Sequence, residues 1–437
     1  MVSNPESTVT VDALFAAAQA KVGDKDLRGA LRVLLELLLL EPLHDEGLRA
    51  AARLASHLGS KEDADRFTAV AEEPTDPQAL YDLGFTFVEQ GLPGLAVRYL
   101  ERCVEHEPDH PLVRYELGYA LFQAGAFETA LPHLARTAAD GSLAGPEPFA
   151  ASLLMVECHL HLGDLDAARD AFEAIDATGD AQADAQLDAI AATIARAARR
   201  FGTGRLDARD WYFIEQGGVT LRVDPELPGG TLGVDWIADL LRRLEAVVDA
   251  LDVAPEVVSF VSPESKPIAA ALAYRLGAQL IDAESFDPHA DEPTLLVAKE
   301  PAEFVPMLTS LRVHDDDLHL FAVTLDPRVD HPIAPDIVGL FSSGVRLPWE
   351  SRLEIEGRSA EDVSVRQVDE DLDMRRDADK TIVAAMQEMD GDDEEIDEAV
   401  ALFKALEDAL LVGNADRHPS RRVYAARQIP RTFLAGV

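Results

Sequence analysis

Residues 77–110 read PQALYDLGFTFVEQGLPGLAVRYLERCVEHEPDH, and this stretch decides the fold of the N-terminal half. Residues 111–144, PLVRYELGYALFQAGAFETALPHLARTAADGSLA, repeat its pattern, so that Gly84 and Gly118 are 34 residues apart. Each copy shows two apolar helical stripes separated by a glycine. One such helix pair cannot bury its apolar face alone, so the period predicts a stacked array of helix pairs.

Three further copies extend the array. A third copy has Gly163, Ala168 and Phe172, displaced by an insertion at residues 141–148, GSLAGPEP, that must bulge out between helices. Two weaker copies precede the clear ones, at residues 11–44 and 45–76. Small residues recur in the second helix of every copy, where helices must cross closely: Ala30, Ala64, Ala96, Ala130 and Ala168. We therefore expect five helix pairs.

The motif positions of the best copy identify the family that the array resembles. Leu83 and Gly84 in the first helix, Ala96 in the second and Pro108 at the end are similar to the tetratricopeptide repeat, over about two-fifths of the chain. The sequence departs from that family where Leu80 stands in place of its Trp, as Arg114 does in the next copy. Residues 181–200 are expected to form a solvating end helix of the array.

This resemblance also implies a binding surface, because the first helices of tetratricopeptide repeats line a concave groove. In this sequence the aromatic groove positions would be Tyr81, Phe85, Tyr115, Tyr119 and Phe122, flanked by the acidic residues Asp82, Glu89 and Glu116. The Lys, Asn and Arg residues with which some relatives hold a C-terminal carboxylate are missing. An aromatic groove with an acidic rim suits a segment that carries apolar anchors and Arg or Lys. The alternative is that several rings pack between repeats as core.

From about residue 207 the pattern changes to short β-branched runs that alternate with helices, which is typical of an α/β layer fold with a mostly parallel sheet. We predict strands at residues 211–215, 219–223, 257–261, 279–282, 294–298 and 318–324, and helices at 234–251, 267–276 and 301–312. The stretch WYFIEQGGVTLRV is expected to be a hairpin that turns at Gly217 and Gly218.

One segment of this second half, VVSFVSPESKPIAAALAYRLGAQLI, is similar to the corresponding part of type I phosphoribosyltransferases. In that family a strand ends in two acidic residues followed by a Thr/Gly-rich phosphate loop. Here the strand TLLVA continues into Lys299, Glu300 and Pro301 instead. The resemblance therefore implies the fold without a seat for phosphoribosyl chemistry, and we expect a non-catalytic domain without a cofactor.

A candidate anion site is formed by Ser262, Ser265 and Lys266, between a predicted strand end and a helix start. Free amides and the helix dipole favour a phosphate at such a place. The alternative is that the serines only cap the helix.

Other motifs give no catalytic or metal site. The standard cofactor and nucleophile motifs, among them the Walker loop and HExxH, do not occur. The acidic run between His314 and His319 is expected to be a solvated turn. Cys103 and Cys158 have no metal-ligand spacing and are expected to be small core residues.

The charge of the chain excludes several classes of partner. With 80 acidic and 39 basic side chains the formal net charge is -41, which repels nucleic acids and anionic membranes. The sequence has no long apolar run, and its start, MVSNPESTVTVDALF, does not resemble a secretory signal. We therefore expect a soluble bacterial protein of the cytoplasm.

The last part of the chain reverses its charge. Residues 370–411 are acidic with a helical pattern, whereas residues 413–437 contain five arginines: Arg417, Arg421, Arg422, Arg427 and Arg431. This basic segment is expected either to lie on the acidic body or to enter the groove, in its own chain or a neighbouring one, through Tyr424, Ile429 and Phe433.

These expectations give a multidomain chain: an all-α repeat solenoid, an α/β domain and a helical acidic extension. The predicted parts are a flexible N-terminus (1–10), the repeats with their end helix (11–204), the α/β domain (205–365), the acidic extension (366–412) and the basic segment (413–437). The predicted function is a protein-interaction scaffold or adaptor. Two alternatives are an enzyme or sensor that binds a nucleotide or sugar phosphate at the strand ends, and a dedicated assembly or secretion chaperone.

Overall fold

A computed structural model gives the fold. It describes residues 10–143, 145–176, 179–202, 204–222, 230–250, 255–285, 292–307, 318–326, 331, 333–342, 344–356, 364–368 and 371–389, and residues 397, 400, 401 and 404. The chain divides into two compact units, Met1–Ala177 and Thr178–Val437. The basic segment 413–437, most of the acidic run at 314–319 and the end of the acidic extension lie outside the described residues.

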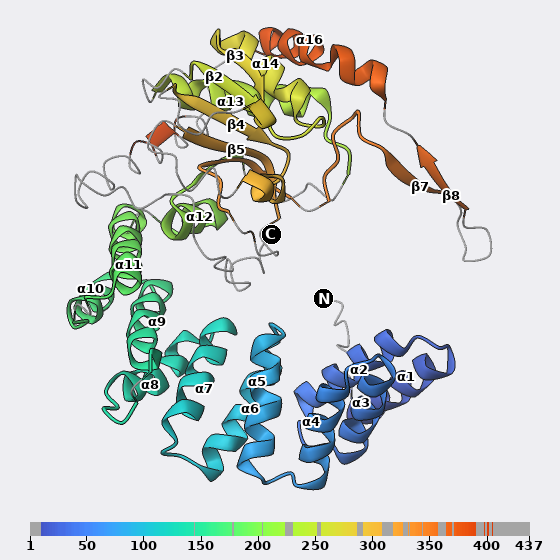
Figure 1. Ribbon diagram of the computed structural model, residues 1–437, viewed down its shortest axis with the longest axis vertical. Helices are drawn as coiled ribbons and strands as arrows, with labels where there is room; N and C mark the ends of the chain where they lie inside the picture. Colours follow the sequence, from blue (N-terminus) through green and yellow to red (C-terminus); the bar gives the residue numbers. More distant parts are fainter. Residues whose placement is uncertain are drawn as a thin grey trace, which may run out of the picture. The chain divides into compact units, whose positions relative to one another are not determined.

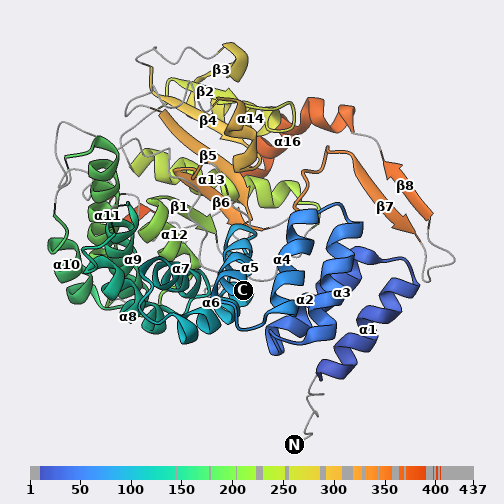
Figure 2. The same ribbon diagram turned by 60° about the horizontal axis from the view of Figure 1, so that its bottom comes forward.

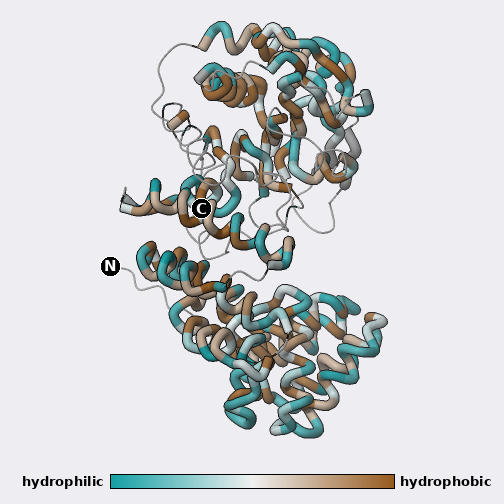
Figure 3. Tube along the Cα trace, turned by 60° about the vertical axis from the view of Figure 1, so that its left-hand side comes forward, coloured by the Kyte–Doolittle hydropathy of each residue, from teal (hydrophilic) through white to brown (hydrophobic). Residues whose placement is uncertain are grey.

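Within its described residues, the first unit is built from ten helices in five successive pairs, as predicted (Figure 1). They are α1 (Val11–Gly23), α2 (Leu27–Leu40), α3 (Asp45–His57), α4 (Lys61–Glu72), α5 (Pro77–Glu89), α6 (Pro93–His106), α7 (Pro111–Gln123), α8 (Phe127–Ala138), α9 (Glu147–His161) and α10 (Leu165–Glu173). These helices carry hydrophilic and hydrophobic residues in alternation along their length (Figure 3). One continuous apolar core runs from Leu14 to Cys158.

Small residues set the helix spacing at the predicted places. The five alanines of the second helices are all buried, and so are Cys103 and Cys158. Gly91, Gly125 and Gly163 adopt positive φ angles of 66°, 74° and 76° at the turns between paired helices. Glycine is favoured there because other residues rarely adopt such angles.

The second unit contains a six-stranded parallel sheet in the order β1-β6-β5-β4-β2-β3. The strands are β1 (Val219–Arg222), β2 (Val257–Phe260), β3 (Gln279–Asp282), β4 (Thr294–Ala298), β5 (Leu318–Leu325) and β6 (Ile337–Phe341). β7 (Arg352–Glu356) and β8 (Ser364–Val368) form a separate antiparallel pair. The strands of a sheet buried on both faces are mostly apolar, as β4, β5 and β6 are.

Helices and two short 3₁₀ segments accompany this sheet. They are α11 (Ala181–Arg200), α12 (Ala208–Gln216), α13 (Val234–Ala250), α14 (Lys266–Leu276), η1 (Ala283–Ser285), η2 (Pro301–Met307) and α16 (Leu372–Glu388). α16 packs against α13 and α14 (Figures 1 and 2). Phe304 of η2 is fully buried against Leu296 and Leu320 of the neighbouring strands.

The predicted strand at 211–215 is wrong, because these residues belong to helix α12. Asp207 and Asp210 form a capping box at its start, and Gly217, with φ 71°, ends it. Trp211, Tyr212, Phe213 and Ile214 are all buried. A helix buried on every side has an unbroken apolar run, which periodicity cannot distinguish from a strand.

The hairpin prediction fails with that strand. β1 pairs in parallel with β6, Val219 opposite Ile337, and not with a preceding strand. The predicted helix at 301–312 is a 3₁₀ segment over Pro301–Met307, and residues 308–312 lie outside the described residues. Strands β6, β7 and β8 were not predicted.

The helix at 181–200 forms as predicted, but it is grouped with the second unit. Arg196 of this helix donates hydrogen bonds to the carbonyl oxygens of Ile214 and Glu215, at 2.8 and 3.2 Å. These carbonyls end α12 and have no acceptor role within the helix. Arg200 also pairs with Asp210. Helix α11 is therefore fixed to α12.

Candidate partner-binding site

Helix α5 presents two stacked rings. Asp76 accepts hydrogen bonds from the Gln78 and Ala79 amides and so caps the helix, with Pro77 at its first position. Residues four apart lie on the same side of a helix. The rings of Tyr81 and Phe85 accordingly stack with centroids 6.0 Å apart and an interplanar angle of 14°.

Helix α7 repeats this arrangement one period later. His110 accepts from the Val113 amide at 3.3 Å and caps the helix before Pro111. Tyr115 and Tyr119 stack with centroids 6.4 Å apart and an angle of 9°. Tyr81 and Tyr115 are half-buried against the core, while Phe85 and Tyr119 are not part of that cluster. Two parallel ring pairs thus follow from the 34-residue period.

Glu116 follows Tyr115 on α7 and is buried, with 8% of its surface exposed. Sequence analysis placed it on the rim, so this burial is a difference from the prediction. Burial raises the pKa of Glu116 to about 7, and the charges of Glu147 and Glu89 raise it further. Among the residues that the structure describes, no cation or hydrogen-bond donor pairs with its carboxyl group. Glu116 is therefore a buried carboxyl group whose ionisation is opposed first by burial and then by the charges of Glu147 on α9 and Glu89 on α5.

Glu147 was missed by sequence reasoning. It opens α9 directly after the insertion at 141–148, which interrupts the period that would have aligned it with the other first helices. Its charge raises the pKa values of Tyr81, Tyr115 and Glu116. These shared effects place Glu147 near all three. An acidic residue in the first turn of a helix after an insertion is the one signal that could have indicated it.

The tyrosines remain neutral hydrogen-bond donors. Burial raises the pKa of Tyr81 to about 12, with smaller contributions from Glu116 and Asp82. Burial also raises the pKa of Tyr115 to about 12, and Glu116 adds to it. We name Tyr81, Phe85, Glu89, Tyr115, Glu116, Tyr119 and Glu147 the acidic aromatic face.

Two residues of the predicted groove have other roles. Phe122 packs edge-on against Phe127 at 5.6 Å and lies 6.0 Å from the His161 ring, so it joins α7 to α8 and α9. Asp82 is exposed and accepts from Gln78 Nε2 at 2.7 Å. Phe122, Tyr81 and Tyr115 all pack against the apolar core of the array, as the alternative expects of some rings.

The three residues of the candidate anion site lie together at the start of α14. The Ser262 hydroxyl accepts from the Ser265 amide at 3.2 Å, and the Ser265 hydroxyl donates to the Ser262 carbonyl at 3.0 Å. Ser262 also donates to Glu303 Oε2 at 3.0 Å, as does the Lys299 amide. Lys266 is exposed, with Nζ 5.2 Å from the Phe260 ring centroid. An incoming anion would therefore compete with Glu303.

This cluster lies where open parallel sheets usually bind ligands. β2 pairs with β3 on one side and with β4 on the other, so the strand order reverses beside it. The residues after β2 and β4 are tied to a later segment. Lys299 pairs with Glu350 at 2.9 Å, and the buried Trp349 donates from Nε1 to the Glu264 carbonyl at 2.9 Å. Side chains of this protein therefore already contact the residues at the carboxyl ends of β2 and β4.

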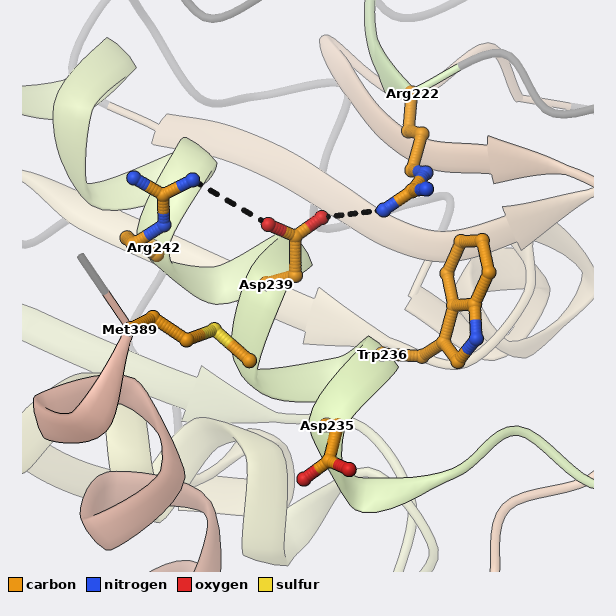
Figure 4. A pocket seen from close by; sticks show the side chains of 6 residues that line it. All are labelled: Arg222, Asp235, Trp236, Asp239, Arg242 and Met389. Carbon is orange, nitrogen blue, oxygen red and sulfur yellow. Dashed lines mark hydrogen bonds and ion pairs between the residues drawn. The ribbon is translucent and has the colours of Figure 1, made fainter. Parts of the chain in front are cut away.

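A cavity of about 510 Å³ lies at the end of β1, along α13. It is lined by Arg222, Asp235, Trp236, Asp239, Arg242 and Met389 (Figure 4). The Arg222 guanidinium lies 3.8 Å from the Trp236 ring centroid and 2.8 Å from Asp239. Burial raises the pKa of Asp239, but Arg243 and Arg222 outweigh this effect and hold the pKa below its ordinary value. Asp239 thus joins β1 to α13.

The described part of the chain contains neither a metal-binding cluster nor a membrane-spanning helix. No group of three His, Cys, Asp or Glu side chains in the described part is placed to hold a metal ion. None of its helices combines the length and apolarity needed to cross a membrane. Burial raises the pKa of Cys103 to about 11 and that of Cys158 to about 12, so both thiols remain protonated.

Comparison with known proteins agrees with this geometry. The family described as "Tetratricopeptide repeat" matches residues 81–144 and 127–185. No curated protein sequence matches. Similar solved structures include the MamA protein, 19% identical, which covers 38% of this chain and 89% of its own with a TM-score of 0.23. Another is YrrB, titled a TPR protein with an unusual peptide-binding site, at 20% identity, 41% and 91% coverage and a TM-score of 0.25.

A third is PilW, titled a widely conserved type IV pilus biogenesis factor, at 16% identity, 48% and 91% coverage and a TM-score of 0.26. The family match covers residues 81–185, the part of the array that contains the buried Ala96, Ala130 and Ala168 and the turn glycines Gly91, Gly125 and Gly163. The N-terminal half of this protein is a solenoid of tetratricopeptide repeats.

Proposed function

We propose that this protein is an interaction scaffold or adaptor that binds a polypeptide segment at the acidic aromatic face. The segment carries aromatic or aliphatic anchors together with arginine or lysine. The observation that carries the proposal is Glu116, a buried carboxyl group next to Tyr115 on α7, whose pKa is raised by burial and then by the charges of Glu147 and Glu89, together with the stacked ring pairs of α5 and α7.

Burial of the Glu116 carboxyl group costs free energy when that group is ionised. An ionised group taken out of water without a partner is destabilised, and like charges beside it add to the cost. A guanidinium or ammonium group would relieve both effects. A hydrogen bond between charged partners contributes about 1.5–3 kcal/mol. Glu116 would therefore discriminate strongly between a basic and a neutral segment.

The aromatic rings supply the second half of recognition. Phe85 and Tyr119 are partly exposed at the ends of their stacks. Ring faces attract cations as well as apolar side chains. The neutral hydroxyl groups of Tyr81 and Tyr115 can also donate to backbone carbonyl groups of a bound segment. Repetition of the ring pair on consecutive first helices suits an extended ligand that crosses them.

The nature of the repeats supports the same role, because each repeat contacts only its neighbours and leaves an extended surface for binding. A dedicated assembly or secretion chaperone would use this face as well and would differ in having one partner. The α/β unit enters the proposal as a second body on the same chain, without a catalytic role.

The proposal is tested with synthetic peptides of equal length measured by fluorescence anisotropy on the full chain. One set alternates aromatic residues with arginine, a second replaces arginine by alanine, and a third replaces it by glutamate. The expected order of affinity is arginine, alanine, glutamate. Equal affinities, or preference for the glutamate set, would overturn the proposal.

A further inference from the structure

The cavity at the end of β1 has no part in the proposed function. Its volume of about 510 Å³ is in the range of small-molecule sites, and it lies where β1 ends at Arg222, beside α13 and Met389, the residue that follows α16. Open α/β sheets bind ligands at the carboxyl ends of their parallel strands. At β4 this edge is contacted by Glu303 and Glu350, whereas at β1 the cavity lies open to solvent.

We propose that this cavity binds a small organic anion, whose carboxylate or phosphate group is held by Arg222 and Arg242 and whose apolar part lies against Trp236 and Met389. The inference is independent of the proposed function, because it concerns the α/β unit alone. That unit would then bind a small molecule, while the repeats bind a polypeptide segment.

Positive charge converges at the centre of this cavity. The Asp239 carboxylate accepts from Arg222 Nη1 at 2.8 Å, from Arg243 Nε at 2.9 Å and from Arg242 Nη2 at 3.4 Å. Three guanidinium groups thus meet at one carboxylate, in a chain whose net charge is -41. Clustered charges of one sign raise the local concentration of ligands of the opposite sign. The cluster therefore favours an anion.

Both arginines that line the cavity are held in place before a ligand binds. The Arg222 guanidinium lies 3.8 Å from the Trp236 ring centroid, and Asp239 lies between Arg222 and Arg242 (Figure 4). Burial opposes ionisation of Asp239, but Arg243 and Arg222 hold its pKa below the ordinary value, so it stays ionised. Side chains that are already ordered lose less entropy when a ligand binds.

The same two guanidinium groups remain accessible. The side chain of Arg222 is 27% exposed and that of Arg242 is 20% exposed, and both line the cavity. A guanidinium group carries five N–H donors, and its flat fork matches the two oxygens of a carboxylate or phosphate group. The arginine pair is therefore suited to an anionic group more than to a neutral one.

The rest of the lining favours an organic ligand over an inorganic ion. Trp236 supplies an aromatic ring, and Met389 supplies a polarisable thioether that contacts aromatic groups favourably. Asp235 also lines the cavity, but it is exposed, so that water and salt screen its charge. Its carboxylate can accept from an amino or hydroxyl group of the ligand. A ligand with an anionic group and an apolar body would contact the whole lining.

The test uses the full chain labelled with 5-fluorotryptophan. Fluorine NMR resolves the three tryptophans, and the resonance that disappears in Trp236→Phe is that of Trp236. The test compounds are indole-3-propionate, its neutral amide and phenyl phosphate. We expect indole-3-propionate to shift the Trp236 resonance saturably, and the amide to bind about tenfold more weakly because it lacks the charge.

Arg242→Gln is expected to weaken binding of indole-3-propionate about tenfold, since it removes one of the two guanidinium groups. Arg376→Gln is the matched control. Arg376 is an exposed arginine of α16 outside the cavity lining, and its replacement should leave the affinity unchanged. Tighter binding of phenyl phosphate identifies phosphate as the preferred group, and tighter binding of indole-3-propionate identifies carboxylate; both outcomes support the inference.

Equal affinity for indole-3-propionate and its amide, or an unshifted Trp236 resonance with all three compounds, would overturn the inference. Unchanged affinity in Arg242→Gln would overturn it as well. The comparison of the acid with its amide uses the wild-type chain, so it decides the matter even if Arg242→Gln does not fold. Peptide titrations report on the repeats, and either proposal can therefore fail without the other.

Discussion

Gly84 on α5 packs directly against Leu100 on α6, because a Cβ atom added at Gly84 would lie 2.9 Å from Leu100 Cγ. The same relationship recurs one repeat later, where a Cβ at Gly118 would lie 3.0 Å from Leu134 Cγ. Both leucines are fully buried. The paired helices of each repeat therefore approach as closely as glycine permits.

Gly84→Ala is expected to destabilise the array by about 1–2 kcal/mol, since the strain of overpacking exceeds the gain in helix propensity. Gly94→Ala in α6 is the control. Its added Cβ would lie 3.4 Å from Leu39 Cδ1, in ordinary contact, and it should be neutral or slightly stabilising. Far-ultraviolet circular dichroism during thermal unfolding measures the difference. Equal midpoints for the two variants would contradict the close packing.

Glu116→Gln is expected to stabilise the array at neutral and higher pH. The folded pKa of about 7 lies above the unfolded value, so between about pH 4.5 and 7 the folded state binds more protons. The wild-type chain therefore loses stability as pH rises through this window, by about 1–3 kcal/mol, and the variant does not. Hydrogen exchange of residues 77–123 at pH 5 and pH 8 measures this locally. If the difference in hydrogen-exchange protection between Glu116→Gln and wild type became smaller as the pH rises, the raised pKa of Glu116 would be contradicted.

Affinity for an arginine-containing peptide is expected to rise between pH 6 and pH 8. Arginine keeps its charge throughout, and the tyrosines of the face stay neutral because burial raises the pKa of each to about 12. Glu89 and Glu147 are the other acidic groups that act on Glu116, and they lie on α5 and α9. Ionisation of Glu116 is then the step that strengthens binding. Anisotropy titrations across this range should give a flat profile for Glu116→Gln; an equally steep one would point to another group.

Asp239→Asn is expected to destabilise the second unit by about 1–3 kcal/mol, because it removes a charged hydrogen-bond acceptor from the buried Arg243 and from Arg222. Arg243, 4% exposed, lies 2.9 Å from Asp239, and Arg222 lies 2.8 Å from it. All three tryptophans belong to this unit, so tryptophan fluorescence during denaturation follows it separately from the array. Asp235→Asn lines the same cavity and serves as the control. A loss below 1 kcal/mol for Asp239→Asn would show that the network is not structural.

The array could be predicted from sequence because its signal is local and repeated. The 34-residue period fixes Gly84 and Gly118 in equivalent contacts, and the alanines of the second helices are buried where the pattern placed them. The α/β unit was predicted less completely. Helix α12 looks like a strand because its four consecutive residues 211–214 are apolar and buried, and the place of β6 beside β1 depends on a pairing across more than one hundred residues.

For the candidate site, too, local patterns could be predicted from the sequence, whereas packing between distant residues could not. Tyr81, Phe85, Tyr115 and Tyr119 were predicted through the resemblance to tetratricopeptide repeats, and their stacking in two pairs follows because residues four apart share a helix face. The burial of Glu116 and the approach of Glu147 depend on packing between α7 and α9, across an insertion that breaks the period. Packing of Phe122 against Phe127 and His161 depends on the same contacts.

The most direct test of the central claim compares one arginine-containing aromatic peptide on three full-length proteins: wild type, Glu116→Gln and, as the control, Glu101→Gln, which changes an exposed glutamate of α6 outside the face. At pH 8 we expect Glu116→Gln to weaken binding about tenfold, the loss of one charge-assisted contact, and Glu101→Gln to leave it unchanged. Equal affinity for all three proteins would contradict the claim that the acidic aromatic face binds a basic segment.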